Sequence, residues 1–356
     1  MRRGIVALAV ALVVMAATAG QASAFQKGFY DEAVVLGYAD DFGFRTLNDL
    51  GADIVRMNLY WNRVAKSRPN DPTNPNDPAY DWSEYDQSLA WAEQYGIEVL
   101  LSVIGTPGWA NGGKAQQYAP NDFGDLEAFS EAAAKHFPQV TKWASGNEPN
   151  APNFLKPQSV RQGGKWVFVS PEIYADMCKA VVDGINAADP RDTVACGLLN
   201  PRGKLVPNGR RDSVAPILFL ERMVRAGAPC EAIGVHPYSS TPKWSPTKKI
   251  RSNSQIVLGT IGTFIRAVDR VCGGKPPIWV TEYGYQTNPP DKLFGVSWRT
   301  QANWMSQAFK IMKANKRIKL GLTFQIVDDS NPGGWQSGVL TNSIKKKPWY
   351  AAFKRL

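Results

Sequence analysis

Short apolar runs rich in β-branched residues alternate with longer amphipathic stretches along most of this chain, and this rhythm limits the fold more than any other feature. Eight strands each followed by a helix, in a chain of 356 residues, predict a single α/β domain, a (β/α)8 TIM barrel. The predicted strands span residues 34–39, 53–60, 98–105, 140–147, 193–200, 231–238, 277–284 and 320–327.

The helical stretches between these runs support the same fold. Ser170 followed by Pro171 is a typical helix start, with the serine expected as N-cap and the proline in the first turn. An open doubly wound sheet is the alternative, but no glycine-rich phosphate loop follows the first predicted strand. The clearest helical stretches span residues 85–95, 126–136, 171–187, 214–226, 256–271 and 299–314.

The first 24 residues have the pattern of a signal peptide. Arg2 and Arg3 form a basic start, residues 5–17 are apolar but too short to span a bilayer, and residues 22–24 read Ala-Ser-Ala. We therefore expect cleavage near Ala24, a single mature (β/α)8 domain over residues 25–356, and export to the extracellular space or cell envelope. No later segment has the length of a membrane span, and we expect a monomer.

The chain is basic, with a net charge of +10, or +8 once Arg2 and Arg3 are removed. The basic residues cluster at 202–211, 248–251 and 345–347. A solvated surface explains such clusters, and an acidic glycan or an anionic cell envelope is the alternative explanation. We expect no nucleic-acid partner, since no nucleic-acid-binding motif is recognisable.

Four cysteines are expected to serve structure in an oxidising compartment, since none lies in a C-x-x-C pair. Cys230 precedes the sixth predicted strand and Cys272 ends the helix after it, so both should reach the bottom face of the barrel. This predicts a disulfide between them. Whether Cys178 and Cys196 pair is left open, because Cys196 lies within a strand and could be a small buried apolar residue.

Two glutamates stand at the ends of predicted strands, where a barrel carries its catalytic groups. Glu148 lies in GNEPN after the fourth strand, which Pro149 terminates, and Glu282 lies in WVTEYG at the seventh. We expect these strands on opposite sides of the ring, with the two carboxylates facing each other across the mouth. A pair of carboxyl groups facing each other across a cleft is the usual catalytic arrangement of glycoside hydrolases.

Other chemistries have less support. The only histidines are His136, expected as a partly buried helix residue, and His236. Two histidines are too few for a metal site built mainly from histidine ligands, and we expect no metal and no cofactor. No G-x-S-x-G motif is present to indicate a serine hydrolase. The alternatives are a carbohydrate-binding barrel that has lost catalysis and, with less support, a carbohydrate esterase or metal-dependent hydrolase.

GNEPN at the fourth strand together with WVTEYG at the seventh resembles the motifs of the retaining clan A glycoside hydrolases, families 5 and 39 above all, over essentially the whole mature chain. The resemblance implies that Glu148 is the general acid/base and Glu282 the nucleophile. Asn147 resembles the asparagine that binds the sugar 2-hydroxyl. The implied substrate is an oligosaccharide or polysaccharide.

Three further residues follow from the same resemblance. Arg56, in IVRMNLYW, is similar to the arginine that hydrogen-bonds the nucleophile, and HPY supplies His236 and Tyr238, the tyrosine orienting the nucleophile. A buried ion pair for Arg56 and a hydrogen-bonded rim position for His236 are the alternatives. A retaining mechanism needs carboxyl groups about 5 to 5.5 Å apart, an ionised nucleophile and an acid that keeps its proton near neutral pH.

Aromatic residues follow several of the predicted strands. Trp61, Trp109 and Trp335 are candidates to stack on sugar rings, with packed loop anchors as the alternative. The family's tryptophan at the end of the eighth strand is missing, since the chain reads TFQIVDDS there. Gln325, Asp328 or a folded-back Trp335 could take its place. The sugar, its linkage and endo or exo action remain open at this stage.

Overall fold

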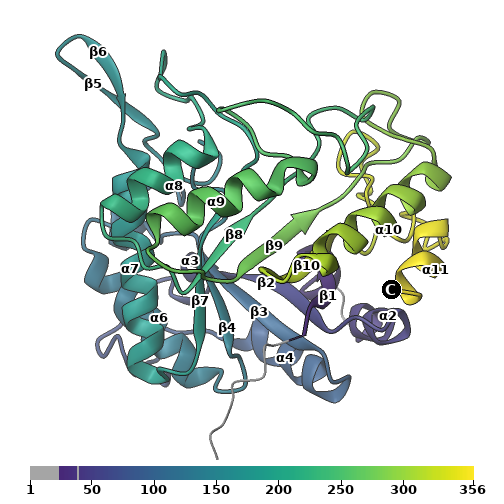
Figure 1. Cartoon of the computed structure of the whole chain (residues 1–356). Coiled ribbons are helices and arrows are strands. Elements are labelled where there is room, and N and C mark those ends of the chain that lie inside the picture. Colours follow the sequence, from purple (N-terminus) through teal and green to yellow (C-terminus); the bar gives the residue numbers. More distant parts are fainter. Residues whose placement is uncertain (1–23, 38–39) are drawn as a thin grey trace, which may run out of the picture.

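A closed barrel of eight parallel strands forms the centre of the computed structural model, which describes residues 24–37 and 40–356 (Figure 1). The (β/α)8 prediction is confirmed. The predicted signal peptide falls almost wholly outside the described residues. In ring order the barrel strands are β1 (Gln26–Tyr30), β2 (Ile54–Tyr60), β3 (Glu98–Ile104), β4 (Lys142–Ser145), β7 (Thr193–Leu199), β8 (Ala232–Val235), β9 (Ile278–Tyr283) and β10 (Ile318–Phe324), and β10 closes on β1.

The prediction for the first strand was wrong. The first strand is β1, whereas the run that begins at Val34 starts inside the short helix α1 (Glu32–Val35). The Asp31 side chain accepts a hydrogen bond from the backbone N–H of Val34, which caps this helix. Gly28 allows β1 to lie close to β2, because a Cβ at this position would lie 1.8 Å from the carbonyl oxygen of Ile54 on β2. Neither feature shows in apolar periodicity.

Helices surround the barrel, and the six predicted stretches are confirmed as helical. One start differs from the prediction: Val169 is the N-cap of α7, and Ser170 is the first helical residue, with its hydroxyl donating to Gln158 Oε1 at 2.9 Å. The remaining helices are α2 (Phe42–Leu50), α3 (Trp61–Val64), α4 (Ser83–Gln94), α5 (Gly108–Asn111), α6 (Phe123–His136), α7 (Ser170–Ala188), α8 (Pro216–Arg225), the 3-10 turn η1 (Leu258–Thr260), α9 (Ile261–Val271), α10 (Trp298–Ala314) and α11 (Pro348–Lys354).

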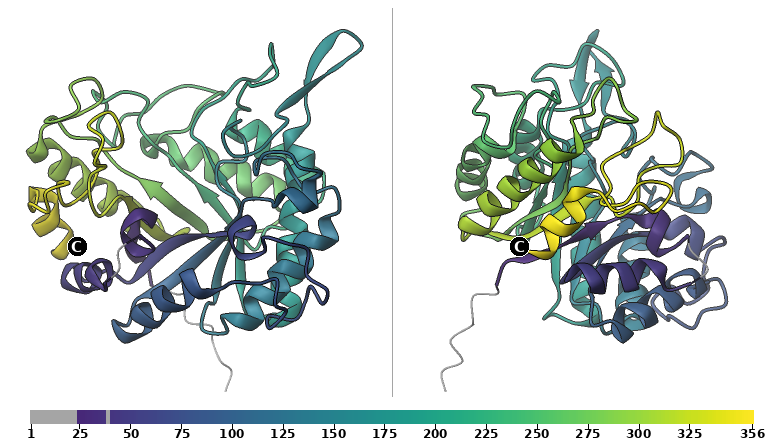
Figure 2. Two further views of the ribbon diagram at one scale, coloured as in Figure 1. Left: turned by 180° about the vertical axis from the view of Figure 1, so that it is seen from behind. Right: turned by 90° about the vertical axis from the view of Figure 1, so that its right-hand side faces the viewer.

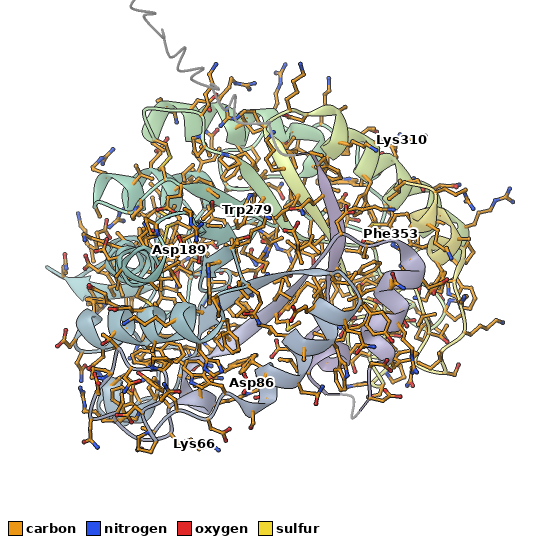
Figure 3. All side chains as sticks on the ribbon, turned by 90° about the horizontal axis from the view of Figure 1, so that it is seen from below. Lys66, Asp86, Asp189, Trp279, Lys310 and Phe353 are labelled. Carbon is orange, nitrogen blue, oxygen red and sulfur yellow. A yellow bond between two sulfur atoms is a disulfide. The ribbon has the colours of Figure 1, made fainter. Side chains whose placement is uncertain are left out.

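Two apolar layers hold the barrel together. The inner layer fills the barrel and includes Ile54, Leu100 and Trp279, which is 3% exposed. Figure 3, seen from below, shows Trp279 among the strands. The outer layer lies between strands and helices, where His136 stacks on Trp82 and bonds Asp86 at 2.7 Å, as a partly buried helix residue. A filled interior leaves the mouth of the barrel as the place for a binding site.

One insertion stands out from the barrel. The antiparallel hairpin of β5 (Ser159–Gln162) and β6 (Lys165–Phe168) follows the loop after β4 and projects beyond the ring (Figures 1 and 2). It lies at the end where the strands terminate. Going round the ring, β4 and β9 are separated by β7 and β8, so the expectation that they lie on opposite sides was wrong by one strand.

The four cysteines form two disulfides. Cys230 and Cys272 are bonded, with 5.9 Å between their Cα atoms, which confirms the predicted pairing. Cys178 on α7 and Cys196 on β7 form a second bond, with Cα atoms 6.0 Å apart, and this answers the question that the sequence left open. The Cys178–Cys196 bond ties α7 to β7, and the Cys230–Cys272 bond ties the segment just before β8 to the C-terminal end of α9.

Among residues 24–37 and 40–356, no helix combines the length and the apolar character needed to cross a bilayer.

Candidate active site

Glu148 is held at the mouth by an unusual backbone. Its φ is 40°, in the left-handed region that residues with a side chain rarely adopt. The Glu148 N–H donates to the carbonyl oxygen of Leu198 on β7 at 3.1 Å, and its own carbonyl accepts from Ala151 N–H at 2.8 Å. Such a conformation costs about 1 to 3 kcal/mol and persists where surrounding contacts over-determine it, commonly at functional sites.

The Glu148 carboxyl group is buried between two polar partners. Asn200 Nδ2 donates to Oε2 at 2.7 Å, and Oε1 lies 2.9 Å from His236 Nδ1. Burial raises the pKa of Glu148 to about 7, and the hydrogen bond from Asn200 opposes this rise only in part. A carboxyl group with this pKa is protonated for much of the time near neutral pH, as a general acid must be.

His236 is fully buried and links the two carboxylates. Its Nε2 lies 2.9 Å from Thr281 Oγ1 and 3.7 Å from Glu282 Oε1. Burial lowers the pKa of His236 to about 4, so the ring is neutral near pH 7. A neutral imidazole can accept the proton of a protonated Glu148 at Nδ1, or donate from Nδ1 to an ionised one, with the Thr281 hydroxyl taking the complementary role. The contact therefore suits both states of Glu148.

Glu282 is surrounded by donors. Arg56 Nη1 donates to Oε1 at 3.0 Å, and the Tyr238 hydroxyl donates to Oε2 at 3.3 Å. Burial raises the pKa of Glu282, and the nearby positive charge of Arg56 opposes that rise. A carboxylate that accepts two such hydrogen bonds is oriented and stabilised in its charged form, which is what a nucleophile requires.

Arg56, on β2, is fully buried and ties the site together. Besides Glu282, its guanidinium donates from Nη2 to Asn147 Oδ1 at 2.6 Å and to Asn58 Oδ1 at 3.2 Å. The ring of Tyr30 lies 4.3 Å from the guanidinium carbon. With Oδ1 of Asn147 occupied, the polar group that this side chain offers to a ligand is the Nδ2 donor.

The two carboxylates are close. One oxygen of Glu148, one of Glu282 and one ring nitrogen of His236 all lie within 4.8 Å of one another, the one such group that could hold a metal ion within the described ranges. Both ring nitrogens of His236 already have partners, and the Arg56 cation sits at hydrogen-bond distance from Glu282. A cation placed here would be repelled by Arg56, so the surroundings fit proton transfer better than metal binding.

A cavity of about 540 Å³ opens over these carboxylates. The exposed aromatic side chains that the structure describes are Phe154, Phe294 and Trp335, between 42% and 55% exposed, and all three line this cavity. Exposed aromatics gathered in one cavity are typical of a ligand-binding site, and the C–H faces of sugar rings stack on such surfaces. Polar side chains of the lining include Tyr30, Asn58, Tyr60, Asn147, Asn153, Asn200, Arg202, Tyr238 and Gln286.

The three tryptophans predicted from the sequence lie in different places. Trp61 is 1% exposed and stacks on Phe129 at 5.6 Å, while Trp109 packs edge-on against Trp61 and donates from Nε1 to Ala65 O. Neither lines the main cavity, although Trp61 borders an adjacent one of about 130 Å³. Their surroundings match the packed-anchor alternative. Trp335 does line the cavity.

Trp335 also folds back over the end of the eighth barrel strand. Its ring lies 5.2 Å from that of Phe324 and 5.6 Å from that of Tyr238. Asp328 is elsewhere, buried in an ion pair with Lys347 Nζ at 2.7 Å, and Gln325 does not line the cavity. Phe324 and Trp335 therefore form the aromatic floor, and Gln325 and Asp328 do not.

The sequence missed several residues of this site. Asn200 ends the fifth predicted strand, so the strand-end rule that found Glu148 could have found it too. Asn58 follows Met57 within β2, and the side of the barrel wall that it faces is known only once the pairing of β2 with its neighbours is known. Phe154 and Phe294 lie in long loops, where nothing in a single sequence distinguishes a cavity lining from a solvent-exposed ring.

Comparisons with known proteins agree with this geometry. The sequence model of Cellulase (glycosyl hydrolase family 5) matches residues 36–321. No curated protein matches the chain. A solved family 39 glycoside hydrolase from Bacteroides cellulosilyticus WH2 superposes with a TM-score of 0.66 at 16% identity, over 94% of this chain and 63% of that protein. The chain thus spans less than two thirds of that relative's length.

Two further solved structures share the fold. GH5_18 from Streptomyces cattleya, in complex with GlcNAc, has a TM-score of 0.65 at 16% identity, covering 94% of this chain and 79% of that one. A monomeric beta-xylosidase from Caulobacter crescentus CB15 has a TM-score of 0.62 at 16% identity, covering 93% and 67%. At these identities the likeness shows the fold alone.

Proposed function

We propose that this chain, which belongs to the cellulase family (glycosyl hydrolase family 5), is an O-glycoside hydrolase that cleaves an oligosaccharide or polysaccharide by double displacement with retention. The separation of the carboxylates carries this proposal. Oxygens of Glu148 and Glu282 lie within 4.8 Å, close to the 5 to 5.5 Å of retaining enzymes and well short of the roughly 6.5 to 9.5 Å that an inverting enzyme needs for water.

In the first step Glu282 attacks the anomeric carbon while Glu148 gives its proton to the leaving oxygen. The carbon–oxygen bond to the leaving sugar breaks and a glycosyl ester of Glu282 forms. Arg56 and Tyr238 hold the attacking carboxylate in place through their hydrogen bonds at 3.0 and 3.3 Å. Asn147 is placed to donate from Nδ2 to the sugar 2-hydroxyl, a contact that strengthens in the transition state.

In the second step water replaces the leaving group. Esterification removes the negative charge of Glu282, so the pKa of Glu148 falls and its ionised form can take a proton from water. The resulting hydroxide attacks the anomeric carbon and releases Glu282. His236, able to donate or accept at Nδ1, accommodates both states of Glu148. The sum of the two steps is hydrolysis with the anomeric configuration kept.

We also place the enzyme outside the cytoplasm as a monomer. The pattern of residues 1–24 and two disulfide bonds support export, since such bonds persist in oxidising compartments. The cleaved leader should be absent from protein recovered from the culture medium. N-terminal sequencing of that protein tests this, with a start near Phe25 expected.

The experiment for the mechanism is Glu282→Ala with azide. Activity on a panel of aryl glycosides and polysaccharides should fall roughly 10³- to 10⁶-fold, because no covalent intermediate can form. Azide fits the space left by the carboxylate and should restore part of the turnover, giving a glycosyl azide of inverted configuration. Glu93→Ala, an exposed change on α4, is the matched control and should keep full activity.

Three results would contradict the proposal. Wild-type product of inverted configuration, followed by NMR of the anomeric proton, would exclude double displacement. Binding of glycans without any cleavage by the wild type would make the protein a carbohydrate-binding barrel. Loss of activity in EDTA, restored by a divalent ion, would instead favour a metal-dependent hydrolase.

A further inference from the structure

Most of the net positive charge of this chain lies in two loops that both contribute residues to the cavity. The loops after β7 and β8, residues 200–215 and 236–257, contain eight basic residues and one acidic residue, a net +7. The chain without its predicted signal peptide carries +8, so these two loops account for nearly all of it. The basic residues are Arg202, Lys204, Arg210, Arg211, Lys243, Lys248, Lys249 and Arg251.

The two loops form one wall. Gly203 N–H donates to Ser254 O at 2.9 Å and Ile256 N–H donates to Pro201 O at 2.7 Å, so backbone hydrogen bonds join them. Both loops leave strand ends at the mouth (Figure 1), and both contribute residues to the cavity. The two loops are therefore joined next to the cavity, which Pro201 and Arg202 line.

Most of these charges lack a carboxylate partner. The single acid, Asp212, pairs with Lys204 at 2.7 Å. Within the described ranges the other seven form no ion pair, and the cavity lining contains no carboxylate besides the two catalytic glutamates. Like charges held together without counter-charges repel one another, a cost that an anionic ligand relieves.

Arg202 is the innermost of the eight. It lines the cavity, and its backbone N–H donates to Asn200 Oδ1 at 3.2 Å, while Asn200 Nδ2 binds Oε2 of Glu148. Two hydrogen bonds thus connect the Arg202 backbone to the acid/base. Because the acid protonates the leaving oxygen, groups on its side of the cavity face the leaving-group sugar.

We propose that this wall selects an anionic glycan, with Arg202 contacting a carboxylate or sulfate on the sugar at the leaving-group side of the cleaved bond. The planar guanidinium suits both anions, since it can donate two parallel hydrogen bonds to either. The remaining basic residues add a long-range attraction along the chain of the polysaccharide. This inference rests on the proposed function, because it assigns a substrate class to the same site.

The test compares glycans that share a backbone and differ in charge. Hydroxyethyl cellulose, carboxymethyl cellulose and cellulose sulfate form one set, and arabinoxylan with glucuronoxylan a second. Binding is measured by affinity electrophoresis with the Glu282→Ala variant, and kcat/KM with the wild type. We expect the anionic members to be preferred, and their advantage to shrink between 10 and 300 mM salt as the Debye length falls from about 30 Å to below 10 Å.

Substitution of Arg202 gives the sharper measurement. Arg202→Gln should reduce the preference for the anionic member over its neutral partner about 10- to 100-fold, as loss of a hydrogen bond between charged groups does. Arg202→Lys should retain part of it. Arg225→Gln, an exposed change of equal charge at the end of α8, is the control and should leave the preference unaltered.

The outcomes separate the two proposals. If neutral glycans are cleaved and no anionic member is bound or cleaved better than its neutral partner, the inference is overturned while the proposed function stands. An equal effect of Arg202→Gln and Arg225→Gln also overturns it. If anionic glycans bind through Arg202 but no glycosidic bond is cleaved in any of them, the proposed function fails. Whether the carboxylated glycans or the cellulose sulfate lose their advantage in Arg202→Gln identifies the anion.

Discussion

Replacing Glu148 with glutamine should remove the proposed general acid and at the same time stabilise the fold above neutral pH. Glutamine resembles the protonated carboxyl group, since its Oε1 can accept from Asn200 and its Nε2 can donate to His236 Nδ1. Burial raises the pKa of Glu148 from the ordinary value of 4.5 to about 7. The native state therefore holds a proton that the unfolded chain has already lost.

The sign and size of the effect follow from this difference. Below pH 4.5 the group is protonated in both states and has no effect on stability. As the pH rises from 4.5 through about 7, the free energy of unfolding of the wild type decreases. At about 1.4 kcal/mol per pH unit, the total decrease reaches about 3 kcal/mol. With an unfolding entropy of about 2.1 cal/mol/K for each of roughly 330 residues, this corresponds to about 4 °C in Tm.

Thermal unfolding followed by circular dichroism from pH 4 to pH 9 measures this effect. The Tm of Glu148→Gln should match the wild type at pH 4 and exceed it by about 4 °C at pH 8. Glu93→Gln, an exposed carboxylate on α4, is the control and should show no pH-dependent difference. A Tm difference for Glu148→Gln that is constant across the range, or absent at pH 8, would refute the argument that burial holds the proton on Glu148.

Two further predictions concern stability. Cys272→Ser removes the disulfide that joins residues 42 positions apart, and by loop entropy it should lower the free energy of unfolding in urea by about 4 kcal/mol. The value of kcat/KM should be preserved, since the bond lies at the face away from the carboxylates. A large fall in kcat/KM together with the loss of stability would contradict this. Lys347→Met should lower the free energy of unfolding by about 3 to 5 kcal/mol, because it leaves the buried Asp328 without the cation that lies 2.7 Å away. Adding Asp328→Asn should recover part of this loss. No recovery would indicate that lost packing around Lys347 is the cause.

Several features of this protein follow from the sequence by itself. Seven of the eight barrel strands and the six clear helices were predictable, because apolar periodicity reports which faces must be buried. The two glutamates proposed as catalytic were also predictable as candidates, since a parallel barrel brings all strand ends to one mouth. Cys230 and Cys272 could be paired for the same kind of reason, as the helix of a βα unit returns to the bottom face.

The tertiary structure alone decided how these parts meet. The first strand, with its polar start, is recognisable only through its pairing with β2 and β10, while the valine run after it became a capped helix. Whether Trp61 and Trp335 are packed or exposed depends on neighbours that are distant in sequence, Phe129 for one and Tyr238 for the other. The pKa of Glu148 depends on burial by several loops at once, and the basic wall forms only because two loops hydrogen-bond to each other. Periodicity is a local property of the chain, whereas contact, burial and the summation of charge are set by residues that the fold brings together.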